Sequence, residues 1–256
     1  MGYTQAEFFT MFFALFVILI LGVIFKFTLR KAPLSVRQMP INVLGAIILI
    51  LELVKQGYHL IAGDWGTWYI PLHFCSFFLV WYAVALFTHG KIRQLMYFCS
   101  IVGGFLVSVL MFIAPRMILH DAAHDVWGSF NHFHTFFYHM GVIAYWVWLL
   151  MLDVFKPERS QIRSAVMIYT GFYFVVITGA FIFQENYTNV LRSDISILEN
   201  LRLSAGQFTY DILLLAIGVA AIAIISTTTY FAMSKWQHYR QKNALQLEEN
   251  QIEQNS

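Results

Sequence analysis

The chain has 256 residues, of which 59% are hydrophobic and only 12% are charged. Because soluble domains carry about 25% charged residues, and because the charges here fall between long apolar runs, the composition predicts an integral membrane protein. The net charge of +2 is too small to favour a nucleic-acid partner, and two cysteines, Cys75 and Cys99, are too few for a disulfide framework, although they could be bridged to each other or free.

Seven apolar stretches are long enough to cross a bilayer, since about 20 helical residues span its hydrocarbon core. An open strand would leave backbone groups unpaired in lipid, so every stretch is expected to be helical. The first stretch has no basic residue before it and no cleavage site after it, which favours a retained span over a signal peptide. The expected spans are residues 8–27, 41–61, 69–88, 95–114, 132–153, 165–184 and 207–233.

Basic residues gather on alternate connecting segments. Twelve of the sixteen Lys and Arg residues lie on one set, three lie in the opposite loops, and Lys55 lies inside a span. Basic residues favour the cytoplasmic side. The sequence therefore predicts an all-α polytopic membrane bundle of about seven helices, with its N-terminus outside and its C-terminus in the cytoplasm. Residues 1–233 would form the transmembrane domain, and residues 234–256 would form a polar tail that continues the last helix.

Polar side chains recur in the outer halves of these spans. Glu52 and Lys55 are three residues apart in the second span, so they share a helix face and can pair. Gln207, Tyr210 and Asp211 open the last span, and seven of nine histidines fall on the outer side. Charged groups in a membrane usually face a wet cavity or the bundle interior. We expect one outward-facing pocket, with these five residues shaping it or binding a substrate. The alternatives are that Glu52 and Lys55 only order the bundle, and that Asp211 hydrogen-bonds Lys55.

The sharpest local feature is the string Pro71-Leu72-His73-Phe74-Cys75. Proline favours the first turn of a helix, so the third helix is expected to start near Ile70, with Cys75 in its first two turns, where the helix dipole favours an anion. Residues two apart on a helix point away from each other, so His73 cannot be the base for Cys75. The base must come from another helix. His139 enters the bundle from the same side at comparable depth. The pattern predicts Cys75 as nucleophile, His139 as base and His73 as a group that orients a carbonyl. The alternative is that Cys75 is a small buried hydrophobe.

Other chemical classes compete with this interpretation. Seven outer histidines could supply zinc ligands, but the chain has no HExxH motif and its last span has no His-x-x-x-His, so no metal or other cofactor is expected. A retinal receptor needs a lysine in its last span, and residues 207–233 contain none. A transporter would show broken helices and halves related by symmetry, and neither is clear here.

On these residues the sequence resembles the YwaF family of bacterial membrane proteins, which is related to the transmembrane protein 164 group. The resemblance rests on the string 71–75, on a Phe-rich run leading to His139-Met140-Gly141, and on the order of about seven spans across roughly residues 40–230. In place of the inserted Met140, the family typically has His followed directly by Gly.

The resemblance implies a cysteine-dependent acyltransferase that moves fatty acyl chains between phospholipids. It implies Cys75 as the acyl-accepting nucleophile and His139 as its base, and His73 belongs to the motif. A phospholipid or lysophospholipid would be the partner, and a bacterial plasma membrane would be the location. A lipid or ester hydrolase, in which water replaces the lysolipid, and a non-enzymatic transporter or assembly factor are the alternative functions. The lipid headgroup, the chain length and the oligomeric state stay open.

Overall fold

The computed structural model describes residues 3–193 and 195–255, and this part of the chain contains helices and loops without any strand. Five helical segments of the described chain are long and apolar enough to cross a membrane. They are α1 (Gln5–Thr28), α3 (Met39–Ala62, preceded by the short α2, Leu34–Arg37), α5 (Gly90–Ile113), α8 (Ser160–Phe183) and α10 (Gln207–Asn255). The structure thus confirms an all-helical membrane protein.

The other two expected spans form shorter or more polar helices. The stretch 69–88 gives α4 (Phe77–Phe87), which has 11 residues, extended by the 3-10 turn Phe74–Ser76. The stretch 132–153 gives α7 (Phe130–Met151), which is long enough but carries several histidines in its N-terminal half. Short elements fill the remaining loops: α6 (Pro115–Leu119) and α9 (Ser196–Ala205).

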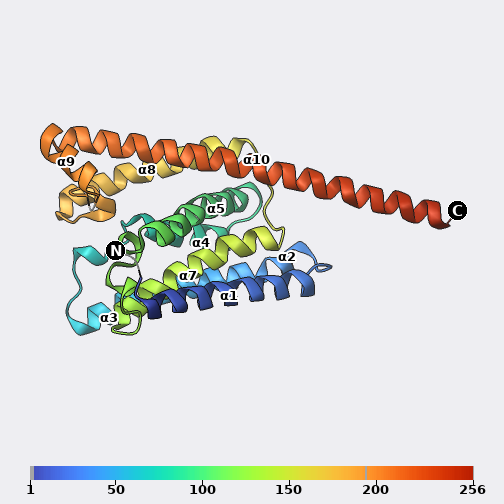
Figure 1. Ribbon diagram of the computed structural model, residues 1–256, viewed down its shortest axis with the longest axis horizontal. Coiled ribbons are helices and arrows are strands. Elements are labelled where there is room, and N and C mark those ends of the chain that lie inside the picture. The colour runs from blue at the N-terminus through green and yellow to red at the C-terminus, as the bar shows by residue number, and fades with distance from the viewer. Residues whose placement is uncertain (1–2, 194, 256) are drawn as a thin grey trace.

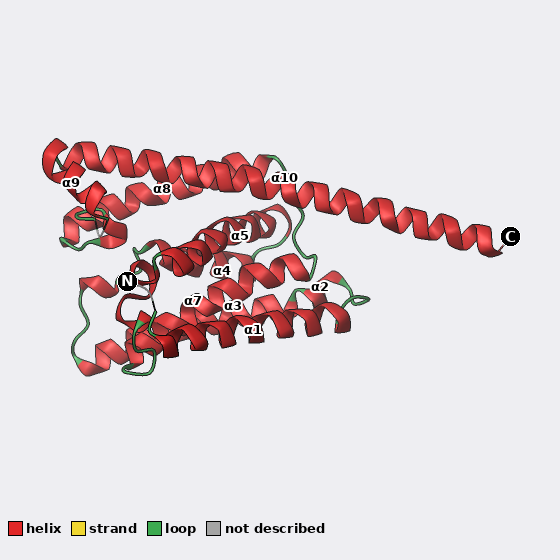
Figure 2. Cartoon of the chain, viewed as in Figure 1, coloured by secondary structure: helices red, strands yellow, loops and turns green. Residues whose placement is uncertain are grey.

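The long helices run side by side in two groups (Figure 1). One group contains α1, α3, α4, α5 and α7, and the other contains α8 and α10, which pack along each other and meet the first group at α5. Figure 2 shows that most of the described chain is helical and that the loops lie mainly at the two ends of the helix bundle. α10 continues unbroken beyond the other helices to Asn255, so the expected continuation of the last helix past residue 233 is confirmed.

α5 occupies the centre of the bundle. Two-thirds of its most apolar stretch (67%) is buried, against 17–22% in the other four membrane-length helices. Gly104 allows this close packing, since a Cβ atom there would lie 2.4 Å from the Trp146 ring. Small residues at helix contacts let membrane helices approach closely. The Trp146 indole also donates to the Ser108 hydroxyl at 3.0 Å, so α7 and α5 are held in register.

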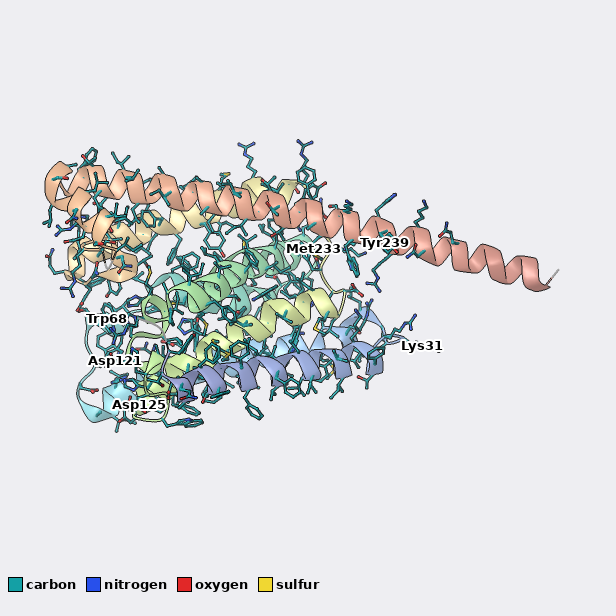
Figure 3. All side chains as sticks on the ribbon, in the orientation of Figure 1. Lys31, Trp68, Asp121, Asp125, Met233 and Tyr239 are labelled. Atoms are coloured by element: carbon teal, nitrogen blue, oxygen red, sulfur yellow. The ribbon has the colours of Figure 1, made fainter. Side chains whose placement is uncertain are left out.

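The two ends of the bundle differ in composition. Trp68, Asp121 and Asp125 lie together at one end, and Lys31 and Tyr239 lie toward the other (Figure 3). The first end collects the long loops that follow α3, α5 and α8. The candidate site described next lies behind these loops.

Candidate functional site

A cavity of about 600 Å³ lies between the two groups of helices and their loops. Its lining is polar where α3, α7 and the loops meet, aliphatic along α5 and α10, and mixed along α8, which contributes Tyr169, Thr170 and Tyr173. Five of the residues singled out from the sequence line this one cavity: Glu52, Lys55, His73, Cys75 and His139. The structure therefore brings the expected nucleophile, the expected base and a buried charge pair into one space.

The segment that carries Cys75 is not the helix start that the sequence predicted. The chain stays extended through His73 (φ −71°, ψ 152°), and only then does the 3-10 turn Phe74–Ser76 lead into α4 at Phe77. The prediction of a helix starting near Ile70 was therefore wrong. Residues before proline avoid the helical region, and the Ile70 backbone is accordingly extended (φ −60°, ψ 131°). Cys75 consequently sits in a tight turn before α4 rather than within an α-helix.

Two hydrogen bonds from other parts of the chain hold this turn. Thr188, in the loop after α8, accepts the Phe74 backbone N–H with its hydroxyl at 2.9 Å. Tyr138 on α7 donates its hydroxyl to the Cys75 carbonyl at 2.7 Å. The Cys75 turn is thus held by residues from distant parts of the sequence: Tyr138 is 63 residues from Cys75, and Thr188 is 114 residues from Phe74.

His139 lines the cavity and has a buried, unpaired imidazole nitrogen. Its Nδ1 atom lies 2.6 Å from the Thr135 carbonyl oxygen. A carbonyl can only accept, so Nδ1 carries the proton and Nε2 is left with its lone pair. Nε2 is buried and has no hydrogen-bond partner among the described residues. The preceding residue on α7, Tyr138, donates its hydroxyl to the Cys75 carbonyl, so α7 contacts the Cys75 turn, and His139 and Cys75 line the same cavity.

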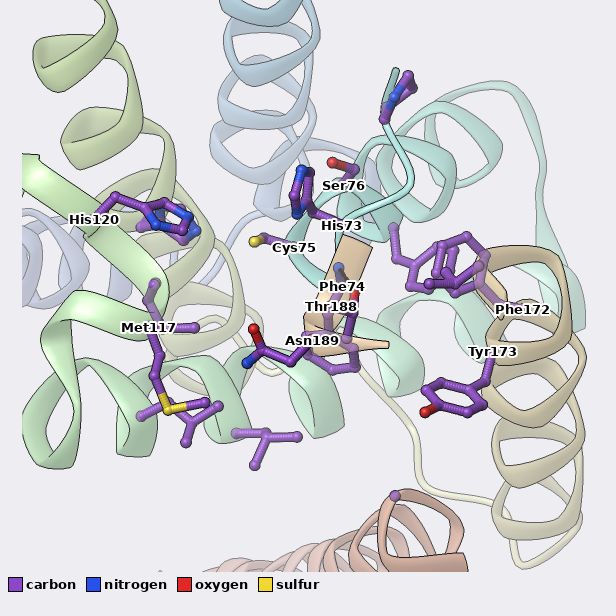
Figure 4. A pocket seen from close by; sticks show the side chains of 18 of the residues that line it. His73, Phe74, Cys75, Ser76, Met117, His120, Phe172, Tyr173, Thr188 and Asn189 are labelled. Carbon is purple, nitrogen blue, oxygen red and sulfur yellow. Dashed lines mark hydrogen bonds between the residues drawn. The ribbon is translucent and has the colours of Figure 1, made fainter. Parts of the chain in front are cut away.

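His120 is a pocket residue that the sequence marked only as one of the seven outer histidines. It directly follows α6, its backbone has φ 49° and ψ −129°, and its ring makes an edge contact with Trp68 at 6.1 Å. In Figure 4 the thiol of Cys75 points toward His120 across the cavity, with His73 on the other side of the thiol. A strained backbone of this kind persists only where surrounding structure enforces it, and often at functional sites.

Backbone strain is concentrated around the cavity. Five non-glycine residues of the described chain have positive φ, and three of them, His120, Thr188 and Asn189, line this cavity. No local sequence signal marks these residues, because their positions depend on loops that fold back over α4.

Glu52 is the centre of a buried polar network. Its carboxylate lies 2.6 Å from the Lys55 ammonium, so the pairing expected from their spacing is confirmed. Gln56 donates to the same carboxylate at 2.7 Å and also to the Tyr69 carbonyl at 2.8 Å. His134 Nε2 lies 3.6 Å from it. The sequence analysis did not single out Gln56, whose amide ties the network to the loop before Cys75.

The polar residues that open α10 lie outside the cavity lining. Gln207 donates to the Val190 carbonyl at 2.8 Å and to the Asp211 carboxylate at 2.9 Å. Tyr210 donates to the Asn189 carbonyl. The described contacts of Asp211 thus run to Gln207 and not, as one alternative had it, to Lys55. These three residues fasten α10 to the loop that carries Thr188 and Asn189.

The remaining histidine and cysteine candidates have structural surroundings. His59 is buried between Asp64 and Asn131, at 2.8 and 2.7 Å, and so links α3 to the start of α7. Cys75 and Cys99 are both free thiols, and Cys99 is fully buried in the core. Among the described residues, no group of three or more His, Cys, Asp or Glu side chains is arranged to hold a metal ion.

Comparison with known proteins gives one match. A family model described as the TMEM164 family matches residues 2–229, whereas no curated protein and no solved structure matched the chain. The matched region includes every residue that lines the cavity and every candidate site residue discussed above. Since the match covers nearly the whole chain, this integral membrane protein belongs to the TMEM164 family.

Proposed function

We propose that this protein is a phospholipid acyltransferase in which Cys75 carries the acyl chain as a thioester. One observation supports this most strongly: Cys75 and His139 line the same cavity, and the Nε2 atom of His139 is buried without a partner among the described residues. A buried polar atom without a partner is costly, so its retention favours a use in chemistry. The resemblance to the transmembrane protein 164 acyltransferases, and membership in that family, point to the same reaction.

The first half of the reaction transfers an acyl group to the protein. His139 Nε2 takes the proton of the Cys75 thiol, and Sγ attacks the ester carbonyl carbon of a phospholipid. The tetrahedral intermediate collapses by breaking the bond to the glycerol oxygen, and this oxygen leaves with the proton now held by His139. The products of this half are a thioester on Cys75 and a lysophospholipid.

The second half regenerates the enzyme. The hydroxyl of an acceptor lysolipid gives its proton to His139 Nε2 and attacks the thioester carbonyl. The C–S bond breaks, and the Cys75 thiolate recovers the proton from His139. His73 and His120 flank the thiol in Figure 4 and would orient the carbonyl by hydrogen bonding. Lys55, paired with Glu52, would face the lipid headgroup.

The same proposal includes a topology. The segments preceding and including α4, together with α7, would complete seven crossings, with the N-terminus outside and the tail of α10 in the cytoplasm. The basic segments support this orientation, as does the gathering of the loops after α3, α5 and α8 at the end opposite Lys31. The cavity would then open to the outer leaflet of a bacterial plasma membrane, the location that the resemblance to the YwaF family implies.

A trapped thioester tests the proposal. Purified wild type, Cys75→Ala and Cys99→Ala would be incubated with a phosphatidylcholine bearing an alkyne on its acyl chain and then treated with hydroxylamine. We expect a hydroxylamine-sensitive label on wild type and on Cys99→Ala that is absent from Cys75→Ala. Label that persists in Cys75→Ala would overturn the cysteine mechanism.

The reaction products distinguish an acyltransferase from a hydrolase. Acyl chains recovered on an added lysolipid indicate the transferase, whereas free fatty acid formed at the same rate with and without lysolipid indicates a hydrolase. Lipid binding without label in any of the three proteins would instead favour a transporter or assembly factor.

A further inference from the structure

The apolar part of the cavity has a defined course along α10. Seven residues between Leu214 and Ile222 line it, together with Leu106 and Leu110 of α5 and Val176 of α8. At a helical rise of 1.5 Å per residue, the α10 lining extends about 12 Å along the helix. None of the α10 residues from 214 to 222 is charged. This part of the cavity is called the apolar arm below.

The apolar arm includes a residue that is also well exposed. Ile217 lines the cavity, yet 47% of its surface is exposed. It lies within a stretch of α10 that is long and apolar enough to cross a membrane, so this exposed face meets acyl chains rather than water. A lipid tail could enter sideways between α10 and its neighbours while its ester reaches the polar end.

We propose that the apolar arm binds the acyl chain that Cys75 receives, and that Gly218 determines how long a chain fits. The inference rests on the proposed function for the identity of the chain, because it places the carbonyl at Cys75 and the hydrocarbon along α10. The occupant is a fatty acyl chain of a membrane lipid, since the arm is apolar, membrane-embedded and continuous with the thiol.

Gly218 is the position at which the arm can be narrowed without disturbing the fold. A Cβ atom built at Gly218 would have no atom within 4 Å, although the residue lines the cavity. A leucine there would therefore extend into free space, and it would also raise the helix propensity. Gly171 on α8 is a matched control: it too has nothing within 4 Å of a Cβ atom, but it does not line the cavity.

Photocrosslinking locates the chain independently of catalysis. Wild type and Cys75→Ala in nanodiscs would be irradiated with a phosphatidylcholine carrying a diazirine in the middle of its acyl chain, and the crosslinked peptides would be sequenced. We expect crosslinks within residues 214–222 in both proteins. Crosslinks confined to the outer faces of α1 and α3 would overturn the inference.

Chain-length preference tests Gly218. Thioester labelling would be compared for dioctanoyl and dipalmitoyl alkyne phosphatidylcholines in wild type, Gly218→Leu and Gly171→Leu. Gly218→Leu should lower the long-chain to short-chain ratio by about tenfold, as expected when a few methylenes lose their pocket, and Gly171→Leu should match wild type. Equal ratios in all three would refute the role of Gly218. Crosslinks at 214–222 without any thioester would support the arm and overturn only the acyl-transfer chemistry.

Discussion

The two walls of the cavity are built from different kinds of side chain and are held in different ways. On the wall formed by α3, α4, α7 and the loops, hydrogen bonds hold the groups nearest the thiol: Thr188 and Tyr138 hold the Cys75 turn, and Thr135 fixes the tautomer of His139. On the wall formed by α8 and α10, the α10 lining is aliphatic, the α8 lining includes Tyr and Thr side chains, and Ile217 of α10 is 47% exposed.

This difference assigns different tasks to the walls. Chemistry needs groups held in a fixed geometry, and the polar wall supplies it by tying together segments far apart in sequence. An acyl chain needs only apolar surface and a way in, and the α8–α10 wall supplies both. Variants of the polar wall should therefore change the rate of acylation, whereas variants of the apolar wall should change which chain is accepted.

The largest effect after loss of Cys75 is expected for His139→Asn. The asparagine amide can still donate to the Thr135 carbonyl, but it offers no basic nitrogen in place of Nε2. The rate of thioester formation should fall about 100-fold to 10,000-fold, the usual contribution of a general base. Labelling with the alkyne lipid, quenched at successive times, measures this rate. An unchanged rate in a protein that still melts like wild type would exclude His139 as the base.

The next effect concerns the Glu52–Lys55 pair. Glu52→Gln removes the charge that compensates Lys55, whereas Glu52→Gln combined with Lys55→Met removes both charges. Breaking a buried pair costs more than replacing both partners. The free energy of unfolding of the single variant should therefore fall by about 2 kcal/mol. This is less than for a fully buried pair, because the Glu52 and Lys55 side chains are 11% and 20% exposed. Thermal unfolding in detergent measures the loss. The double variant should recover most of it, and a double variant less stable than the single one would contradict this reading.

The same double variant also tests the headgroup role of Lys55. If Lys55 faces the lipid headgroup, the folded double variant should label more slowly than wild type with phosphatidylglycerol, whose headgroup is anionic. Unchanged labelling would leave the pair with a purely structural role.

A smaller effect is expected at Thr188. Thr188→Val keeps the branched shape but removes the hydroxyl that accepts the Phe74 N–H. Loss of one such hydrogen bond is worth about 1 kcal/mol, so labelling of Cys75 should slow roughly fivefold. Thr188→Ser restores the hydroxyl and should label like wild type. Slowing that is equal in the two variants would show that the hydroxyl does not position the turn.

The smallest effect lies outside the cavity, in α9. The guanidinium of Arg202 hydrogen-bonds the Glu199 carboxylate and lowers the pKa of Glu199 from its ordinary value of 4.5 to about 2. A lowered pKa in the folded state stabilises the protein above the ordinary pKa, and this stabilisation is lost as the pH falls toward 2. Wild type should melt slightly above Glu199→Gln at pH 7, and the difference should shrink on acidification. A difference that grows at low pH would contradict the assignment.

The long helices could be predicted from the sequence because their signal is local. Apolar runs such as 8–27 and 95–114 must form helices in lipid, because only a helix satisfies their backbone hydrogen bonds within the segment. The observed helices α1 and α5 match these two runs closely. The Glu52–Lys55 pair was likewise predictable, because three-residue spacing on one helix fixes the contact.

Much of the polar wall could not be predicted, because loops build it. The prediction that a helix starts near Ile70 was wrong, because proline also restricts the backbone of the residue before it. In addition, the extended segment through His73 is followed by a turn that Thr188 holds from a distant loop. His120 was counted only among the seven outer histidines and was not placed beside Cys75 for the same reason: its position depends on a strained turn after α6 that no local pattern indicates. Gln207, Tyr210 and Asp211 were expected at the cavity and instead hold the loop beside it.

Intact-mass and peptide mass spectrometry of the protein after incubation with dipalmitoyl phosphatidylcholine tests the central claim most directly. The account predicts a mass increase equal to one palmitoyl group, located on the peptide that contains Cys75, removed by hydroxylamine and lost on addition of a lysophospholipid that becomes acylated. An unmodified Cys75 peptide in a protein that still transfers acyl chains, or the adduct on Cys99 instead, would contradict it.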